Sequence, residues 1–221
     1  MINAWTLPVS REDDPIQKIS GIPNPAGKSL GDLSMDFWKA QLVGSEFRKI
    51  ETVFTRNIAK ILAEQVALSE VSGAEINLLE LSRDVIVGAG LRAFFGDKLL
   101  EMHPDFVTKY IAFDAESWKL WFKWPFSKSM YANKKAVEDA LQSWLEVPVQ
   151  ERGEMSFLVR TVEKTQVAIG TPLSDLARIM SLLIFMYVIF LAFISRYVLI
   201  RIETASTQTL TKQHIGQWPI S

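Results

Sequence analysis

The sequence lacks cysteine. Its 221 residues include no Cys and only two His, His103 and His214. Disulfides, thiolate zinc sites, iron–sulfur clusters and cysteine nucleophiles are therefore excluded, and so is a metal site built from several histidines. The chain has no excess of charge of one sign either, because it contains 24 Lys and Arg and 25 Asp and Glu, which gives a net charge of −1. This balance argues against a broad nucleic-acid-binding surface, so no nucleic-acid partner is expected.

No segment as long as a β-strand alternates apolar and polar residues, whereas helical periodicity is frequent. Between residues 46 and 68, apolar side chains recur every three to five positions, which predicts one amphipathic helix. Ser34 is the expected N-cap of the preceding helix, Asn77 begins a capping-box pattern, and Thr171-Pro172 predicts a further helix start. Other helices are expected over residues 78–86, 131–145 and 157–169, so the fold class is mainly α.

The apolar content is high, at 48% of the residues with a mean hydropathy of +0.12. Much of it lies between Met180 and Ile200, where Ser181, Ser195 and Arg196 are the unfavourable residues for a bilayer. About 20 such residues suffice to cross a membrane, so this segment is either a single-pass span or a helix covered on all sides. The expected division is an irregular segment (1–33), a helical region (34–179), an apolar helix and transmembrane candidate (180–200) and a polar tail (201–221).

Two motifs suggest ligand chemistry. Residues 85–93 match the G-x-G-x-x-A dinucleotide fingerprint through Gly88 and Gly90, with Asp114 or Glu116 as a candidate ribose-binding acid. The helical spacing before the glycines instead favours close helix contact. His103 precedes Pro104 and is expected to be a loop or cap residue rather than a catalytic base.

The second motif is the series Trp118, Trp121 and Trp124, interleaved with Lys119 and Lys123. Stacking on single-stranded nucleic acid, contact with a membrane interface and ordinary core or rim packing all fit this pattern, and packing is favoured. No residue is assigned as catalytic, cofactor-binding or metal-binding.

The order of several segments resembles the middle of fungal cytochromes P-450, the haem-thiolate monooxygenases. These segments are Ser82–Asp97, Pro104–Phe106, Phe113–Lys119, Tyr131–Lys135, Trp144-Leu145 and Gly170–Arg178, within residues 22–185. The resemblance implies a helical fragment of that fold with one long apolar C-terminal helix. It also implies that Gly88 and Gly90 lie in a buried helix before the Phe94-Phe95-Gly96 turn.

For function, the resemblance implies haem-dependent monooxygenation of lipophilic small molecules in secondary metabolism, at the endoplasmic reticulum membrane. The family holds its haem iron through a Cys thiolate, and this sequence has no Cys. The C-terminal half of the family's sequence has no counterpart in these residues, and Leu42 stands where the family has a basic partner for a haem propionate. We therefore expect a truncated relative that binds no cofactor and is inactive on its own. The alternatives are a non-enzymatic protein anchored in a membrane by Met180–Ile200, and a flavin- or nicotinamide-binding oxidoreductase.

Overall fold

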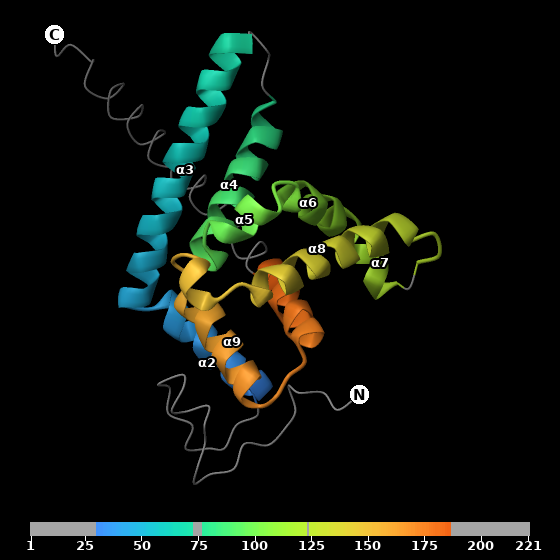
Figure 1. Ribbon diagram of the computed structural model, residues 1–221. Coiled ribbons are helices and arrows are strands. Elements are labelled where there is room, and N and C mark those ends of the chain that lie inside the picture. The colour runs from blue at the N-terminus through green and yellow to red at the C-terminus, as the bar shows by residue number, and fades with distance from the viewer. Residues whose placement is uncertain (1–29, 73–76, 123, 187–221) are drawn as a thin grey trace, which may run out of the picture. The chain divides into compact units, whose positions relative to one another are not determined.

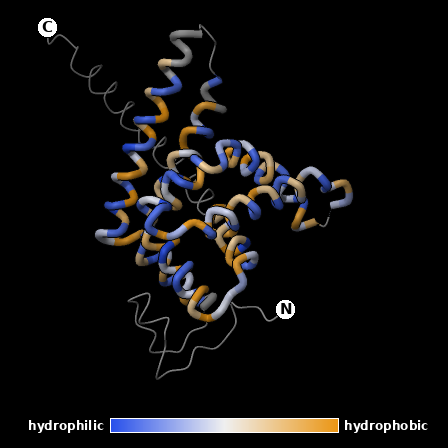
Figure 2. The backbone as a smooth tube through the Cα atoms, viewed as in Figure 1, coloured by the Kyte–Doolittle hydropathy of each residue, from blue (hydrophilic) through white to orange (hydrophobic). Residues whose placement is uncertain are grey.

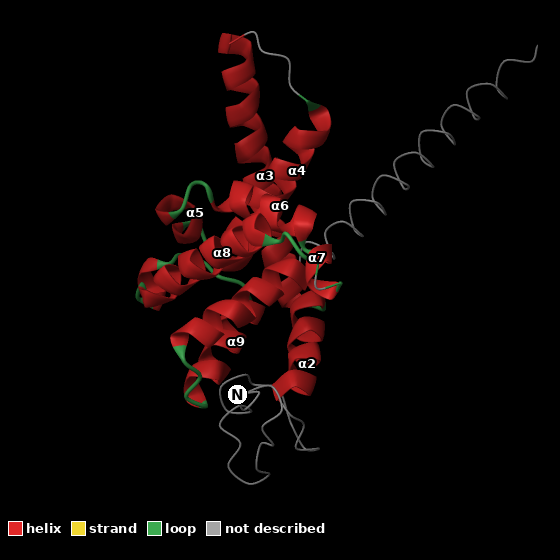
Figure 3. Ribbon diagram, turned by 90° about the vertical axis from the view of Figure 1, so that its right-hand side faces the viewer, coloured by secondary structure: helices red, strands yellow, loops and turns green. Residues whose placement is uncertain are grey.

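The computed structural model describes residues 30–72, 77–122 and 124–186 (Figure 1). The chain divides into two compact units, Met1–Leu182 and Leu183–Ser221. Within the described ranges every regular element is a helix and no strand occurs (Figure 3), which confirms the mainly α fold class. Residues 183–186 of the second unit are helical, and the predicted irregular segment before residue 30 lies outside the described residues.

The first three helices are α2 (Leu30–Leu42), α3 (Ser45–Ser72) and α4 (Leu78–Phe95). Helix α2 already begins at Leu30, so the prediction of Ser34 as its N-cap is wrong. The turn between α2 and α3 passes through Gly44, whose φ of 74° is a conformation that glycine adopts without steric cost. Helix α4 begins directly after Asn77, as the capping pattern predicts.

Helix α3 packs along α4 (Figure 1). Its charged residues Arg48, Glu51 and Arg56 are exposed, whereas Phe47 and Ile61 on its apolar stripe are half-buried. Hydrophobic and hydrophilic residues accordingly alternate along this helix in Figure 2. The amphipathic helix predicted for residues 46–68 is therefore confirmed.

Four helices follow: α5 (Lys98–Met102), α6 (Phe106–Glu116), α7 (Trp118–Trp121) and α8 (Lys128–Glu146). Helices α6 and α8 pack against each other. Both present large buried side chains, namely Phe106, Tyr110, Phe113, Val137, Leu141 and Trp144. Figure 1 shows α7 and the connection to α8 at the outer end of this helix pair, away from α2, α3 and α9.

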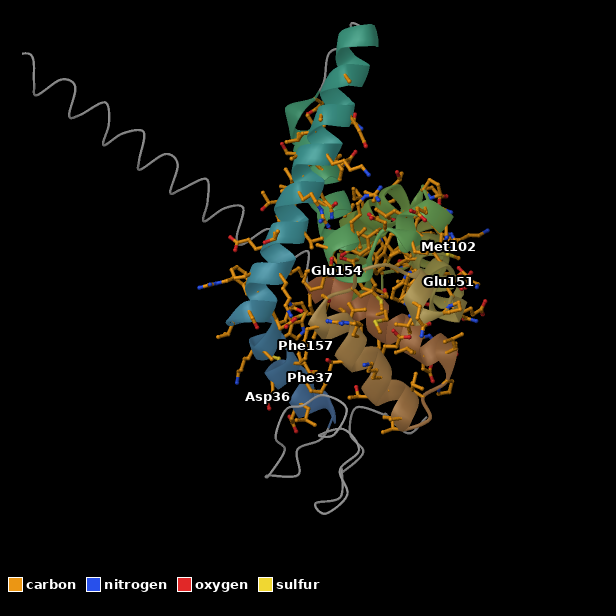
Figure 4. All side chains as sticks on the ribbon, turned by 60° about the vertical axis from the view of Figure 1, so that its left-hand side comes forward. Asp36, Phe37, Met102, Glu151, Glu154 and Phe157 are labelled. Atoms are coloured by element: carbon orange, nitrogen blue, oxygen red, sulfur yellow. The ribbon has the colours of Figure 1, made fainter. Side chains whose placement is uncertain are left out.

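The 3-10 turn η2 (Val149–Glu151) leads to α9 (Phe157–Ala168), which packs against α2. Figure 4 shows Phe37 of α2 and Phe157 of α9 where these two helices meet. The side-chain carbonyl of Gln41 on α2 accepts a hydrogen bond of 3.0 Å from the backbone N–H of Leu158. The N-cap of α9 is Ser156, whose hydroxyl accepts a hydrogen bond from the Val159 N–H.

A last described helix covers residues 173–186. The prediction of Thr171 as its N-cap is wrong, because the first helical hydrogen bond runs from the Leu176 N–H to the Pro172 carbonyl. The Thr171 hydroxyl instead donates to the side-chain carbonyl of Gln166 at 2.6 Å. The described helices include none that is both long and apolar enough to cross a membrane. Residues 187–200 of the predicted transmembrane segment lie outside the described residues.

The end of α4 is fixed against the loop before α9. Gly96 has a φ of 79°, and a Cβ atom at this position would lie 2.3 Å from the carbonyl oxygen of Arg152. The Arg152 guanidinium is buried, forms a 2.8 Å ion pair with Glu163 and lies 4.6 Å from the ring centroid of Trp144. It also donates to the carbonyls of Leu145 and Val147. The guanidinium therefore has a carboxylate, two carbonyls and an aromatic ring as partners, and it connects the C-terminal end of α8 and the η2 turn to α9.

Candidate functional site

The glycine motif forms the buried middle of α4. Residues 85–93 are one continuous helix, and Gly88 lies against α3, where an added Cβ would be 3.6 Å from Ile61 Cδ1. The strand and the phosphate-binding turn that a dinucleotide fingerprint needs are not formed by these residues. The dinucleotide interpretation of this motif is therefore wrong, and the prediction that Gly88 and Gly90 lie within a buried helix is confirmed.

His103 is the C-cap of α5, in agreement with its predicted role as a loop or cap residue. Its Nε2 atom lies 2.8 Å from the hydroxyl oxygen of Ser143 on α8. The Ser143 hydroxyl donates its own hydrogen to the Ala140 carbonyl at 3.0 Å. The contact therefore links the end of α5 to α8.

Ligand-binding groups are scarce elsewhere among the described residues. They contain no cluster of three or more His, Asp or Glu able to hold a metal ion. A surface hollow of about 350 Å³ lies between α8 and the helix that begins at residue 173. Its charged residues are already paired: Lys134 with Glu138, Lys135 with Asp139 and Arg178 with Asp175.

The feature that remains is an exposed aromatic surface, which we call the aromatic loop (residues 117–122 and 124–127). It comprises α7 and the connection to α8. Its five aromatic side chains are between 45% and 91% exposed: Trp118, Trp121, Phe122, Trp124 and Phe126. The favoured prediction that the tryptophans fill the core or its rim is therefore wrong. Sequence reasoning selected three of these five residues and did not single out Phe122 or Phe126.

Three rings of the aromatic loop, Trp118, Phe122 and Trp124, form a contacting group. The centroid of Trp118 lies 5.7 Å from that of Trp124 and 6.4 Å from that of Phe122. The ammonium group of Lys119 lies 5.9 Å from the Trp118 ring centroid, within the range of a cation–π interaction. Trp118, Phe122 and Trp124 thus form one aromatic cluster, and Trp121 and Phe126 are the two most exposed rings of the same loop.

Polar contacts hold both ends of the aromatic loop. The Glu116 carboxylate accepts hydrogen bonds from Lys119 at 2.5 Å and from the Ser129 hydroxyl at 2.9 Å, and these bonds lower the pKa of Glu116. The Ser127 hydroxyl donates to the Trp124 carbonyl at 2.6 Å, and the Trp124 N–H donates to the Lys119 carbonyl at 3.1 Å. The end of α6 and the start of α8 therefore fix the loop in a defined conformation.

Phe126 combines two unfavourable features. It is 91% exposed, and its φ of 68° lies in the left-handed region that non-glycine residues rarely adopt. A backbone conformation of this kind costs on the order of 1–3 kcal/mol, and exposure of the ring leaves its apolar surface in water. Neither feature contributes to the core of the fold, so the position is a candidate for a role outside it.

The helix behind the loop contains buried polar groups. Burial raises the pKa of Asp114 on α6 above its ordinary value. Burial also raises the pKa of Tyr110, and the nearby Asp114 carboxylate adds to that shift. Asp114 and Glu116, the candidate ribose-binding acids, therefore belong to α6 and to the base of the aromatic loop.

Comparison of this chain with protein-family models, with curated protein sequences and with solved structures finds no match.

Proposed function

We propose that this chain is a non-enzymatic helical protein that attaches to the surface of a membrane through its aromatic loop. The observation that carries the proposal is the set of five exposed aromatic rings in the loop, three of which, Trp118, Phe122 and Trp124, lie in contact. Large exposed apolar patches mark surfaces that contact a partner or a membrane. Contact of the tryptophans with a membrane interface was one of the alternatives from the sequence, and the exposure of these rings supports it.

The tryptophan content of the loop favours a membrane surface as its partner. Trp side chains concentrate at the boundary between lipid headgroups and acyl chains, because the ring is apolar and its N–H still reaches water. Three of the five exposed rings are Trp118, Trp121 and Trp124. The loop also lies at the outer end of the α6–α8 pair (Figure 1), where α2, α3 and α9 do not stand in its way.

The test is flotation of the purified full chain with vesicles of mixed neutral and anionic phospholipid. Trp121→Ala and Phe126→Ala are the test variants, and Met35→Ala and Val167→Ala are controls that remove exposed apolar side chains from α2 and α9. We expect the loop variants to float less and the controls to float like the unmodified chain. Equal flotation of all five proteins would refute the proposal.

A carbonate wash of the same vesicles separates this attachment from a single-pass anchor at Met180–Ile200. Protein held by the loop alone is released, whereas a transmembrane segment resists extraction. Retention of the loop variants and of the unmodified chain after the wash would favour the anchor, with the endoplasmic reticulum as the expected membrane.

The second candidate is a relationship to the cytochromes P-450. It is favoured by the position of Gly88 and Gly90 in a buried helix that ends at Phe94-Phe95-Gly96. The residues present do not fit a haem-thiolate centre, because the sequence has no Cys to supply the thiolate. The complete family oxidises lipophilic small molecules, and we propose that these 221 residues do not. A thiolate-type Soret band from the reduced, carbon-monoxide-treated chain would overturn this.

A further inference from the structure

The aromatic loop and the start of α8 are rich in lysine, although the chain as a whole is close to neutral. Residues 117–137 contain five Lys and neither Asp nor Glu, whereas the net charge of the chain is −1. Glu116 before this segment and Glu138 and Asp139 after it form ion pairs with three of these lysines.

Pairing within the fold divides the four of these lysines that the structure describes into two kinds, while Lys123 lies outside the described residues. Lys119 is bound to Glu116 and largely covered, and Lys134 and Lys135 are bound to Glu138 and Asp139 on the next turn of α8. Lys128 is exposed and forms no ion pair with any described residue. It is the first residue of α8 and follows Phe126 by two positions.

We propose that the aromatic loop is selective for anionic phospholipid bilayers, with Lys128 as the residue that contacts the headgroups. This inference rests on the proposed function, and it names the membrane that the loop binds. The rings of Trp121 and Phe126 enter the interface, and the Lys128 ammonium stays at headgroup level, because a long lysine side chain keeps its charge in the polar layer. A lysine near an anionic bilayer strengthens binding about fivefold.

Charge complementarity favours lipid over the other partners that aromatic and basic residues attract. A single-stranded nucleic acid needs a basic groove that follows several phosphates. Here Lys119, Lys134 and Lys135 are already paired, which leaves Lys128 as the one unpaired cation among the described residues of 117–137. One cation beside a cluster of apolar rings fits a bilayer surface, where the rings supply most of the attachment.

The experiment compares two vesicle types: neutral phosphatidylcholine alone, and phosphatidylcholine with about one third phosphatidylserine. The variants of the full chain are Lys128→Ala, Lys128→Glu and the control Lys164→Ala, which removes an exposed lysine of α9. On anionic vesicles we expect binding to fall about fivefold for Lys128→Ala and roughly 30-fold for Lys128→Glu. On neutral vesicles, and for Lys164→Ala on both types, binding should be unchanged.

Salt gives a second readout, because 1 M salt shortens the Debye length to about 3 Å. We expect it to remove the difference between anionic and neutral vesicles and to leave the loop-dependent binding in place. Equal binding to both vesicle types, still lost in Trp121→Ala, would overturn the anionic selectivity and leave the proposed function standing. Binding unaffected by either Lys128 or Trp121 substitution would overturn both. Tighter binding to a single-stranded oligonucleotide than to anionic vesicles would also overturn the lipid assignment.

Discussion

Removal of Trp121 and Phe126 is the most direct perturbation of the aromatic loop. These two side chains are 80% and 91% exposed, more than the other three rings of the loop. Their replacement by Ala therefore takes little from the packed part of the fold. Any change in vesicle binding should reflect the surface of the loop rather than loss of folded protein.

The magnitude follows from the exposed area. A large aromatic side chain offers about 150–250 Å² of surface. With the exposed fractions above, about 150 Å² of each ring is available for burial. Complete removal of that area from water is worth about 4 kcal/mol at about 25 cal/mol per Å². Insertion to the depth of the headgroup boundary removes about half of the area from water, so each ring contributes about 2 kcal/mol, or roughly 30-fold in affinity.

The assay is equilibrium binding of the full chain to vesicles over a range of lipid concentrations. We expect each single variant to bind roughly 30-fold more weakly, and the double variant about 900-fold more weakly. Circular dichroism and thermal melting should show the same helical content and stability for the variants and the unmodified chain. A loss of less than about threefold in the double variant would refute the reasoning, since ring burial would then not drive attachment.

Other predictions concern stability, each measured on the full chain by urea or thermal denaturation. Phe126→Gly should stabilise the fold by about 1 kcal/mol by relieving the left-handed φ, while weakening vesicle binding; a destabilised variant would mean that this backbone is not strained. Gly96→Ala should destabilise by about 2–4 kcal/mol, because its Cβ would lie 2.3 Å from the Arg152 carbonyl oxygen at a φ of 79°, and a neutral effect would contradict that contact. Glu163→Ala should cost about 3–5 kcal/mol by leaving the buried guanidinium of Arg152 unpaired, and a cost below 1 kcal/mol would show that water replaces the carboxylate. Burial raises the folded-state pKa of Asp114 above its unfolded value, so the stability that protonated Asp114 allows is fully present below the unfolded pKa and is lost as the pH rises through the folded pKa. Asp114→Asn removes this loss and should therefore raise the melting temperature more at pH 7 than at pH 3. The opposite order would contradict the direction of the pKa shift.

Helical periodicity predicted most of the elements because it reports burial directly. The stripe of residues 46–68 corresponds to α3, and the buried residues of α8 include Val137, Leu141 and Trp144 at helical spacing. The two wrong caps have a different cause. A cap depends on which backbone groups are left without partners, and a Ser or Thr near a helix start can serve another element. Thr171 does so by binding Gln166 instead.

The candidate site was visible in the sequence only as a spacing of tryptophans. The spacing of Trp118, Trp121 and Trp124 favoured core or rim packing, but periodicity alone does not determine which elements cover a short helix. In the structure α7 is four residues long and lies at the end of the α6–α8 pair, so its rings stay exposed. The left-handed φ of Phe126 has no sequence signal, since that conformation is usually signalled by glycine or asparagine.

The contacts that hold the helices together do not involve the exposed rings of the aromatic loop, and this supports the membrane proposal. The end of α4 is held by contacts of Gly96 and Arg152, and the α6–α8 pair is held by buried residues such as Tyr110 and Leu141. None of these contacts needs the exposed rings. A sequence constrained only by folding would therefore tolerate polar residues in the aromatic loop, and it would favour glycine at position 126. The apolar and strained residues that stand there are accounted for by a surface that takes the rings out of water, as the interface of a bilayer does.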